Sequence, residues 1–177
     1  FFFFFVHWRL LKAFLYILTQ HINKDVRLIV FVNGEYETQM HKLAEDLNLS
    51  NKVCFLPFDK NPFKYLRNAD MFVLSSNFEG FPVVLAEATS LGIPFVGTRK
   101  SMPEEMFYDK EVYEQCVCDV EDVKENFTPE IAADDIALGN VMLKMINDDS
   151  FRNGFYNKVR IMVGKEDQFS SYLSLLL

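Results

Sequence analysis

The chain has 177 residues, 50 % of them hydrophobic, and a formal net charge of −7. A chain of this length and composition can bury one hydrophobic core, which excludes a disordered polypeptide. Acids and bases are mixed along the sequence with acids in excess, which argues against a nucleic-acid-binding protein because such proteins need a basic face for phosphates.

The chain opens with an apolar run, FFFFFV at residues 1–6, followed by a stretch with helical periodicity. This pattern predicts a buried strand and then a helix over residues 10–22. His7, Arg9 and Lys12 interrupt the apolar residues before the ~20 that a membrane-spanning helix needs. The sequence start is therefore expected to belong to a folded domain.

Short apolar runs alternate with helical segments along the rest of the chain. Strands are predicted at 27–32, 53–56, 70–75, 94–98 and within 112–120. Helices are predicted at 36–47, 61–68 and 82–91 and, from Pro129 onward, in segments that break near Asp148 and Gly164. The run RLIVFV at 27–32 is typical of a strand buried on both faces. This alternation predicts an α/β fold with a parallel sheet between two layers of helices, and ligands in such folds bind beyond the carboxyl ends of the strands.

Three cysteines, Cys54, Cys116 and Cys118, are too few for a disulfide framework and favour a reducing compartment. The Cys-Val-Cys segment at 116–118 has the residue types of a metal site. No second pair of ligands accompanies it, so buried thiols on a strand are the preferred interpretation.

The segment 75–94, SSNFEGFPVVLAEATSLGIP, directly follows a predicted strand and therefore lies at the ligand-facing edge. Pro82 suits the first position of a helix, and Gly80 permits close backbone approach. The helix start offers N–H groups and partial positive charge to a phosphate. Glu79 and Glu87 can accept hydrogen bonds from sugar hydroxyls. These groups suggest a site for a nucleotide that carries a sugar; two solvated carboxylates at a helix start are the alternative.

The same residues resemble the donor-binding signature of the retaining glycosyltransferases of group 1, a family with the two-domain GT-B fold. The likeness is in the order EGFP, then LAEA, then GIP, with seven residues between the two glutamates. It extends over residues 7–173 and includes the turn Asn33-Gly34-Glu35. The resemblance implies that residues 1–177 form one Rossmann-like nucleotide-sugar-binding domain, the C-terminal half of a glycosyltransferase, with its last helices at 130–177.

The resemblance also implies a role for each site residue. Glu79 would act as a catalytic residue on the transferred sugar, and Arg9 would neutralise the departing diphosphate. Glu87 would bind the ribose, and backbone N–H groups would hold the diphosphate. The donor-binding set is Glu87, Ser76, Asn77, Phe78, Gly80, Phe81, Pro82, Val83 and Phe58. The base would lie against the loops 56–58 and 60–62.

The expected activity is transfer of a hexosyl unit from a UDP- or GDP-type sugar donor to a saccharide or lipid-linked acceptor, in polysaccharide or glycolipid synthesis. The family implies neither a metal nor a cofactor besides this donor substrate. The acceptor-binding N-terminal half is missing, so the chain alone is expected to bind a donor without transferring sugar efficiently. The few cysteines favour a cytoplasmic protein, and the acidic charge predicts no nucleic-acid partner. Because enzymes of this family often act at a membrane face, peripheral association of the parent chain with the inner face of the membrane stays open.

Two departures from the family pattern keep rival hypotheses open. The loop after the first strand, which in the family carries both an Arg and a Lys, retains Arg9 but has lost the residues that bear the Lys. Arg99, Lys100 and Ser101 replace the glycine pair expected after Thr98, and the two bases either add charge to the pocket or form a solvated loop. The first rival is a degenerate, non-catalytic domain that acts as an interaction module. The second is a nucleotide-binding α/β domain with unrelated chemistry.

Overall fold

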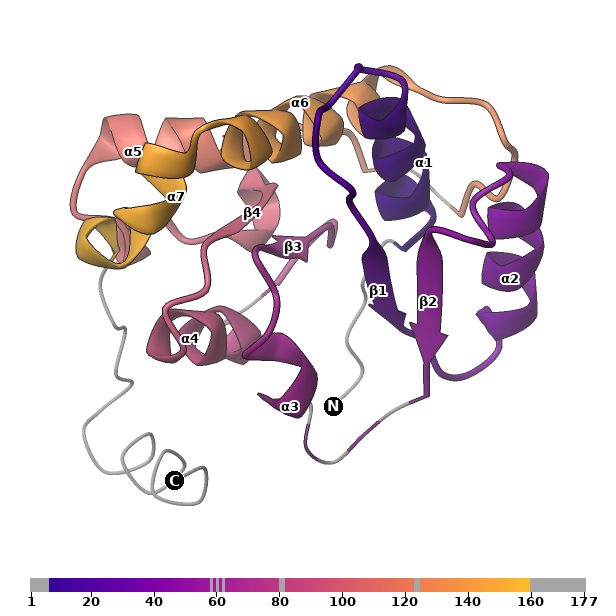
Figure 1. Cartoon of the computed structure of the whole chain (residues 1–177), viewed down its shortest axis with the longest axis horizontal. Helices are drawn as coiled ribbons and strands as arrows, with labels where there is room; N and C mark the ends of the chain where they lie inside the picture. Colours follow the sequence, from indigo (N-terminus) through magenta and orange to yellow (C-terminus); the bar gives the residue numbers. More distant parts are fainter. Residues whose placement is uncertain are drawn as a thin grey trace.

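A computed structural model describes residues 7–57, 59, 61, 63–79, 82–122 and 125–159. Within them, parallel strands alternate with helices (Figure 1). In one group of strands, β1 (Leu28–Phe31) pairs with β2 (Val53–Leu56). The other group has the order β3 (Phe72–Leu74), β4 (Phe95–Thr98), β5 (Val117–Cys118). The strand predicted at 1–6 lies outside the described residues.

Helices cover both sides of the strands, which confirms the predicted α/β, Rossmann-like fold. Figure 1 shows α5 and α6 on one side of β3 and β4, and α3 and α4 on the other. The α-helices are α1 (His7–Leu18), α2 (Glu37–Asp46), α3 (Phe63–Leu66), α4 (Val83–Ser90), α5 (Lys110–Cys116), α6 (Ala133–Asn147) and α7 (Asp149–Asn153). Three 3₁₀ turns span Arg99–Ser101, Glu104–Met106 and Phe155–Lys158.

The first helix differs from its predicted bounds at both ends. It begins at His7 and ends at Leu18, whereas the periodicity predicts 10–22. The Thr19 hydroxyl donates to the carbonyl of Tyr16 at 2.6 Å, and His21 adopts a φ of 49°. A side-chain bond to the backbone and a left-handed residue both oppose further helix, which explains the earlier end.

Residues 112–120 contain the predicted last strand, but most of the segment is helical. Asp109 caps α5 because its carboxylate accepts from the N–H of Glu111 at 2.6 Å, and the helix then runs to Cys116. Only Val117 and Cys118 form β5. The cap residue was the local signal for this helix.

The expectation that 27–32 is buried on both faces is wrong for one face of β1. Leu28 and Val30 are buried, but Ile29 is 49 % exposed. Among the described strands β1 pairs only with β2, and Ile29 lines a cavity of about 80 Å³ that separates β1 from Phe72 and Val73 of β3. Within the part of the chain that the structure describes, one face of β1 therefore lacks the cover that a central strand has.

Aromatic side chains that precede α5 and follow α7 pack against β4 and belong to the hydrophobic core. Phe155 lies 4.9 Å from Phe95 of β4 between ring centroids, and Phe107 lies 5.7 Å from Phe95. The break predicted near Asp148 falls between α6 and α7, where the Asp148 carboxylate accepts from the N–H of Phe151 at 2.7 Å. The break predicted near Gly164 lies outside the described residues.

The thiols differ in exposure, and this predicts which of them reacts. Cys54 on β2 is exposed, whereas Cys116 at the end of α5 and Cys118 on β5 are buried. Burial raises the pKa of each buried thiol to about 12, so at pH 8 almost none of either is the reactive thiolate. We expect a colorimetric disulfide reagent to modify one thiol of the native chain, and all three in guanidinium.

The control for this experiment is Cys54→Ser, which should leave no thiol that reacts quickly in the native state. Rapid modification of two or three thiols in the native wild-type chain would contradict the burial of Cys116 and Cys118.

Candidate functional site

The predicted signature leaves β3 at its carboxyl end and leads into α4. Ser75 and Ser76 are buried, Asn77 and Glu79 are partly buried, and the Phe78 side chain is 74 % exposed. Polar groups therefore lie inside the turn and an aromatic ring lies on its surface. The predicted donor-binding residues Gly80, Phe81 and Phe58 lie outside the described residues.

Hydroxyl groups tie the signature to the end of the next strand. Ser76 Oγ donates to Glu79 Oε1 at 2.7 Å, while the carbonyl of Ser76 accepts from Thr98 Oγ1. Thr98 Oγ1 also lies 2.8 Å from Ser101 Oγ, which donates to the carbonyl of Thr98 at 2.9 Å. The Glu79 carboxylate is thus held against the ends of β3 and β4. The sequence does not single out Thr98 or Ser101 for this role; a hydroxyl at the end of a neighbouring strand was their only signal.

The helix after the signature begins one residue later than predicted. Pro82 is the cap residue, with no side-chain cap bond, and α4 starts at Val83. The N–H of Leu85 donates to the carbonyl of Pro82 at 2.9 Å. The N–H groups of Val83 and Val84 lie in the first turn, where a helix has no acceptors of its own. They are therefore placed to bind an anion.

Glu87 lies in the second turn of α4, as predicted, and its side chain is only 7 % exposed. A carboxylate is costly to bury without partners. This burial contradicts the alternative of a solvated helix residue at position 87.

Arg9 lies in the first turn of α1 and is 1 % exposed. Its Nη1 donates to Asn77 Oδ1 at 2.9 Å and to the carbonyl of Ser75 at 3.3 Å. Its Nη2 donates to the carbonyl of Glu121 at 3.2 Å and lies 3.7 Å from a carboxylate oxygen of Asp134. Burial lowers the pKa of Arg9, and the Asp134 carboxylate opposes this shift. The guanidinium joins α1, the signature and the segment after β5.

Lys12, one turn further along α1, is also buried, with 1 % of its side chain exposed. Burial lowers the pKa of its ammonium, against the attraction of Asp135 and Glu130. Lys12 therefore faces α6 and the segment before it.

The two bases after β4 are paired with acids. Arg99 donates to both carboxylate oxygens of Glu114, at 2.9 and 2.8 Å, and to Asp119 at 2.7 Å. Lys100 lies 2.8 Å from Asp122. These hydrogen bonds raise the pKa of Arg99, with Glu114 as the main cause. Of the two interpretations of this loop, the structure favours a surface loop with neutralised charge.

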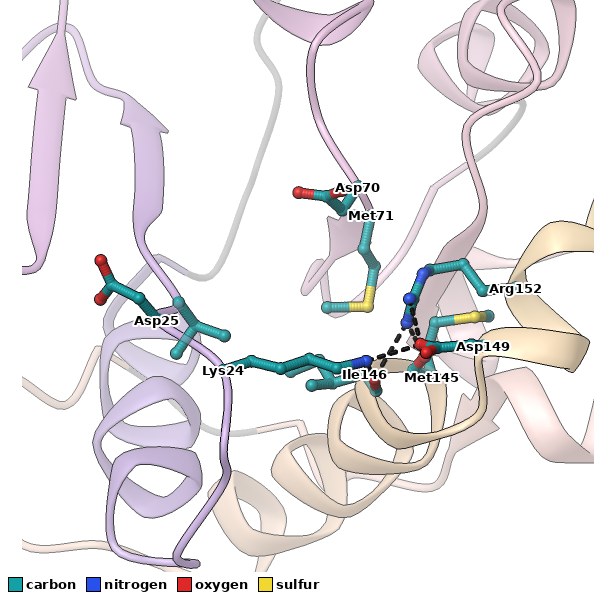
Figure 2. Close-up of a pocket in the computed structure, with 9 residues that line it drawn as sticks. Lys24, Asp25, Asp70, Met71, Met145, Ile146, Asp149 and Arg152 are labelled. Carbon is teal, nitrogen blue, oxygen red and sulfur yellow. Dashed lines mark hydrogen bonds and ion pairs between the residues drawn. The ribbon is translucent and has the colours of Figure 1, made fainter.

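A cavity of about 300 Å³ lies at the opposite end of the strands (Figure 2). Lys24 to Val26 precede β1, and Asp70 and Met71 precede β3. Figure 2 shows Lys24 and Arg152 both turned toward Asp149, with Lys24 Nζ 2.6 Å from its Oδ1. None of the residues lining this cavity belongs to the predicted site.

Two further findings concern the described ranges only. No group of three or more His, Cys, Asp or Glu side chains is placed there to hold a metal ion. None of the helices there is both long enough and apolar enough to cross a membrane.

Sequence comparison gives a family match over most of the chain. The model of the family "Glycosyl transferases group 1" matches residues 7–129. Over 100 residues the chain is 37 % identical to an uncharacterized glycosyltransferase of Methanocaldococcus jannaschii, covering 56 % of this chain and 24 % of that protein. Over 140 residues it is 29 % identical to the N-acetylgalactosamine-N,N'-diacetylbacillosaminyl-diphospho-undecaprenol 4-alpha-N-acetylgalactosaminyltransferase of Campylobacter jejuni, covering 78 % of this chain and 34 % of that protein. The chain thus spans about a quarter to a third of these two relatives.

Solved structures share the fold. A variant of TarM from S. aureus, in complex with fondaparinux, alpha-GlcNAc-glycerol and UDP, gives a TM-score of 0.69 at 19 % identity, over 94 % of this chain and 32 % of that one. The C-terminal domain of a glycosyl transferase group 1 family protein (LpcC) of Francisella tularensis gives 0.64 at 15 % identity, over 86 % and 74 %. At these identities the likeness shows the architecture, which is that of GT-B glycosyltransferases.

Proposed function

The chain belongs to the glycosyl transferases group 1 family, and from this premise we propose that it binds the nucleotide-sugar donor of a retaining glycosyltransferase. One observation carries the proposal: a buried carboxylate, Glu87, and a partly buried one, Glu79, lie on either side of the N-terminus of α4, beyond the carboxyl end of β3. An anion-binding helix start between two hydrogen-bond acceptors has the chemistry of a sugar linked to a diphosphate.

Each part of the donor then has a partner. The N–H groups of Val83 and Val84 bind the diphosphate. Glu87 accepts hydrogen bonds from the ribose hydroxyls, as carboxylates do in dinucleotide-binding folds. Glu79, held by Ser76, contacts the transferred sugar. This scheme uses no metal, because the N–H groups at the helix start stabilise the departing diphosphate.

The donor is a UDP- or GDP-sugar, and the acceptor is a saccharide or a lipid-linked saccharide. The presence of UDP in the TarM structure supports a uridine donor. The name of the Campylobacter jejuni relative, which specifies a diphospho-undecaprenol, supports a lipid-linked acceptor. The likeness to an isolated C-terminal domain supports the assignment of this chain to the donor-binding half. A second domain would supply the acceptor site, so transfer by this chain alone would be slow.

A non-catalytic interaction module is the second candidate. The enclosure of Arg9 favours it, because a guanidinium that is 1 % exposed does not contact a diphosphate in this conformation. The donor-binding domain must bind a nucleotide, whereas the non-catalytic interaction module need not.

A thermal-shift titration with UDP, GDP, UDP-glucose and GDP-mannose tests the proposal. A ligand at 100 times its dissociation constant adds about 2.7 kcal/mol to the free energy of unfolding. We expect the melting temperature to rise with one base and not the other. Unchanged melting with all four ligands at millimolar concentration would favour the interaction module.

A further inference from the structure

The two groups of strands are not joined in the part of the chain that the structure describes, because β1 pairs with β2 and β3 pairs with β4. Two cavities lie between β1 and β3. Residues that precede the two strands, among them Asp25 and Met71, line the cavity of about 300 Å³ (Figure 2). Residues of the strands themselves, among them Ile29 and Val73, line the cavity of about 80 Å³. A groove therefore runs along the facing sides of β1 and β3, from their amino ends toward their carboxyl ends.

The backbone of each strand has one edge turned toward this groove. The N–H groups of Val32 and Phe72 donate to backbone carbonyls on the side of β2 and of β4, at 3.0 and 2.8 Å. Successive residues of a strand direct their N–H groups to opposite edges, so those of Phe31 and Val73 point away from β2 and β4. Phe31 and Val73 both line the smaller cavity. Because buried backbone N–H and C=O groups require partners, the two edges suit a strand that lies between them.

The side chains of the groove determine which kind of strand fits. Ile29 is 49 % exposed. Phe31, Phe72 and Val73 are only partly buried, whereas strands inside a parallel sheet are covered on both faces. Ser75, toward the carboxyl end of the groove, is 1 % exposed, and its Oγ has no hydrogen-bond partner among the described residues. The occupant is therefore apolar along its length and brings a polar group, such as a backbone carbonyl, to the end near Ser75.

We propose that residues 1–6, the sequence FFFFFV, bind in this groove as a strand parallel to β1 and β3. All six residues are apolar. They lead directly into His7, the first residue of α1, which lines the smaller cavity. After α1 the chain returns to Lys24 at the amino end of the groove, as a connection between neighbouring parallel strands must. The sheet then has the order β2, β1, residues 1–6, β3, β4, β5, which is that of a doubly wound sheet.

The length of the segment favours it over a strand from another chain. The neighbouring strand β1 has four residues, and a turn from a strand into a helix takes about two. Six residues therefore suffice for both. A strand from a second copy would leave these six apolar residues uncovered beside a groove that they fit. The inference concerns the sheet beneath the proposed site and does not depend on the ligand that the chain binds.

A Phe3→Asp variant tests the occupant in the full chain. A carboxylate is costly to bury in an apolar groove, so we expect the melting temperature to fall by about 10 °C or more, or the chain to fail to fold. The matched control is Phe78→Asp, the same substitution at a side chain that is 74 % exposed, which should shift melting by at most about 2 °C. Equal melting temperatures for the two variants would overturn the proposal, because only a segment outside the core tolerates the charge.

Hydrogen exchange of the wild-type chain tests the pairing without a variant. We expect the amides of Phe31 and Val73 to exchange about as slowly as those of Val30 and Leu74, which point to β2 and β4, in a chain that light scattering shows to be monomeric. Exchange of Phe31 and Val73 at the rate of an unfolded peptide would mean that no strand lies in the groove. Protection found only in a dimer, and lost on dilution, would assign the groove to a strand of a second copy. Either result would overturn the proposal.

Discussion

A Glu87→Gln variant should bind the preferred nucleotide sugar about a hundred times more weakly than the wild type. Glu87 is only 7 % exposed, so hydrogen bonds between its carboxylate and a bound ribose would form largely away from competing water. Hydrogen bonds to a charged group contribute about 1.5–3 kcal/mol, and ~2.7 kcal/mol corresponds to a hundred-fold change in affinity. Glutamine keeps the shape but offers one acceptor and one donor where two ribose hydroxyls both donate. Isothermal titration calorimetry measures the loss.

Glu111→Gln is the control for this variant. It removes the same charge from the exposed first turn of α5 and should leave the affinity unchanged. The melting temperature of Glu87→Gln, measured alongside, separates a change in stability from a change in affinity. If Glu87→Gln binds as tightly as Glu111→Gln, then Glu87 does not bind the ribose.

A Gly97→Ala variant should lose about 3 kcal/mol or more of its free energy of unfolding, a large part of the 5–15 kcal/mol of a typical domain. Gly97 pairs with Leu74 of β3 and with Val117 of β5. A Cβ at this position would lie 2.3 Å from the carbonyl oxygen of Leu74 and 2.9 Å from Met102 Sδ. The thioether can move, but the carbonyl belongs to the β3–β4 ladder, so relief of the clash disrupts the strands that carry the signature. Urea denaturation measures the cost.

Gly92→Ala separates steric contact from backbone strain. Gly92 has a φ of 70°, and a Cβ there would meet nothing within 4 Å. It should cost about 1–2 kcal/mol, the strain of a left-handed residue alone. Equal urea midpoints for the two variants would mean that β3 and β4 do not approach as closely as described.

The fold could be predicted from the sequence where apolar runs are short and bounded. Residues 53–56 form β2 with the predicted bounds, because VCFL lies between a polar turn and Pro57. The prediction failed where a local cap decides the structure: Asp109 starts a helix in a segment whose apolar residues also suit a strand. The exposure of Ile29 depends on which strands are neighbours in space, and periodicity carries no information on that.

The candidate site likewise has parts that the sequence predicts and parts that depend on contacts between distant residues. The spacing of Glu79 and Glu87 places one in a turn and one on a helix, and the structure has them there. The bond between Arg9 and Asn77 joins residues 68 positions apart, and no local pattern encodes it. The pairing of Arg99 with Glu114 and Asp119 likewise depends on α5 folding back beside β4.

The neutralised bases after β4 have a consequence for how an anion reaches the site. Arg99 and Lys100 are matched by carboxylates, Arg9 is enclosed, and the chain as a whole carries a charge of −7. A diphosphate at the proposed site would therefore be attracted at short range by backbone N–H groups and repelled at long range by the acidic surface. Dissolved salt screens repulsion beyond a Debye length of about 10 Å at 0.1 M. Higher ionic strength should therefore speed association with this edge, whereas it slows association with a lysine-lined phosphate site.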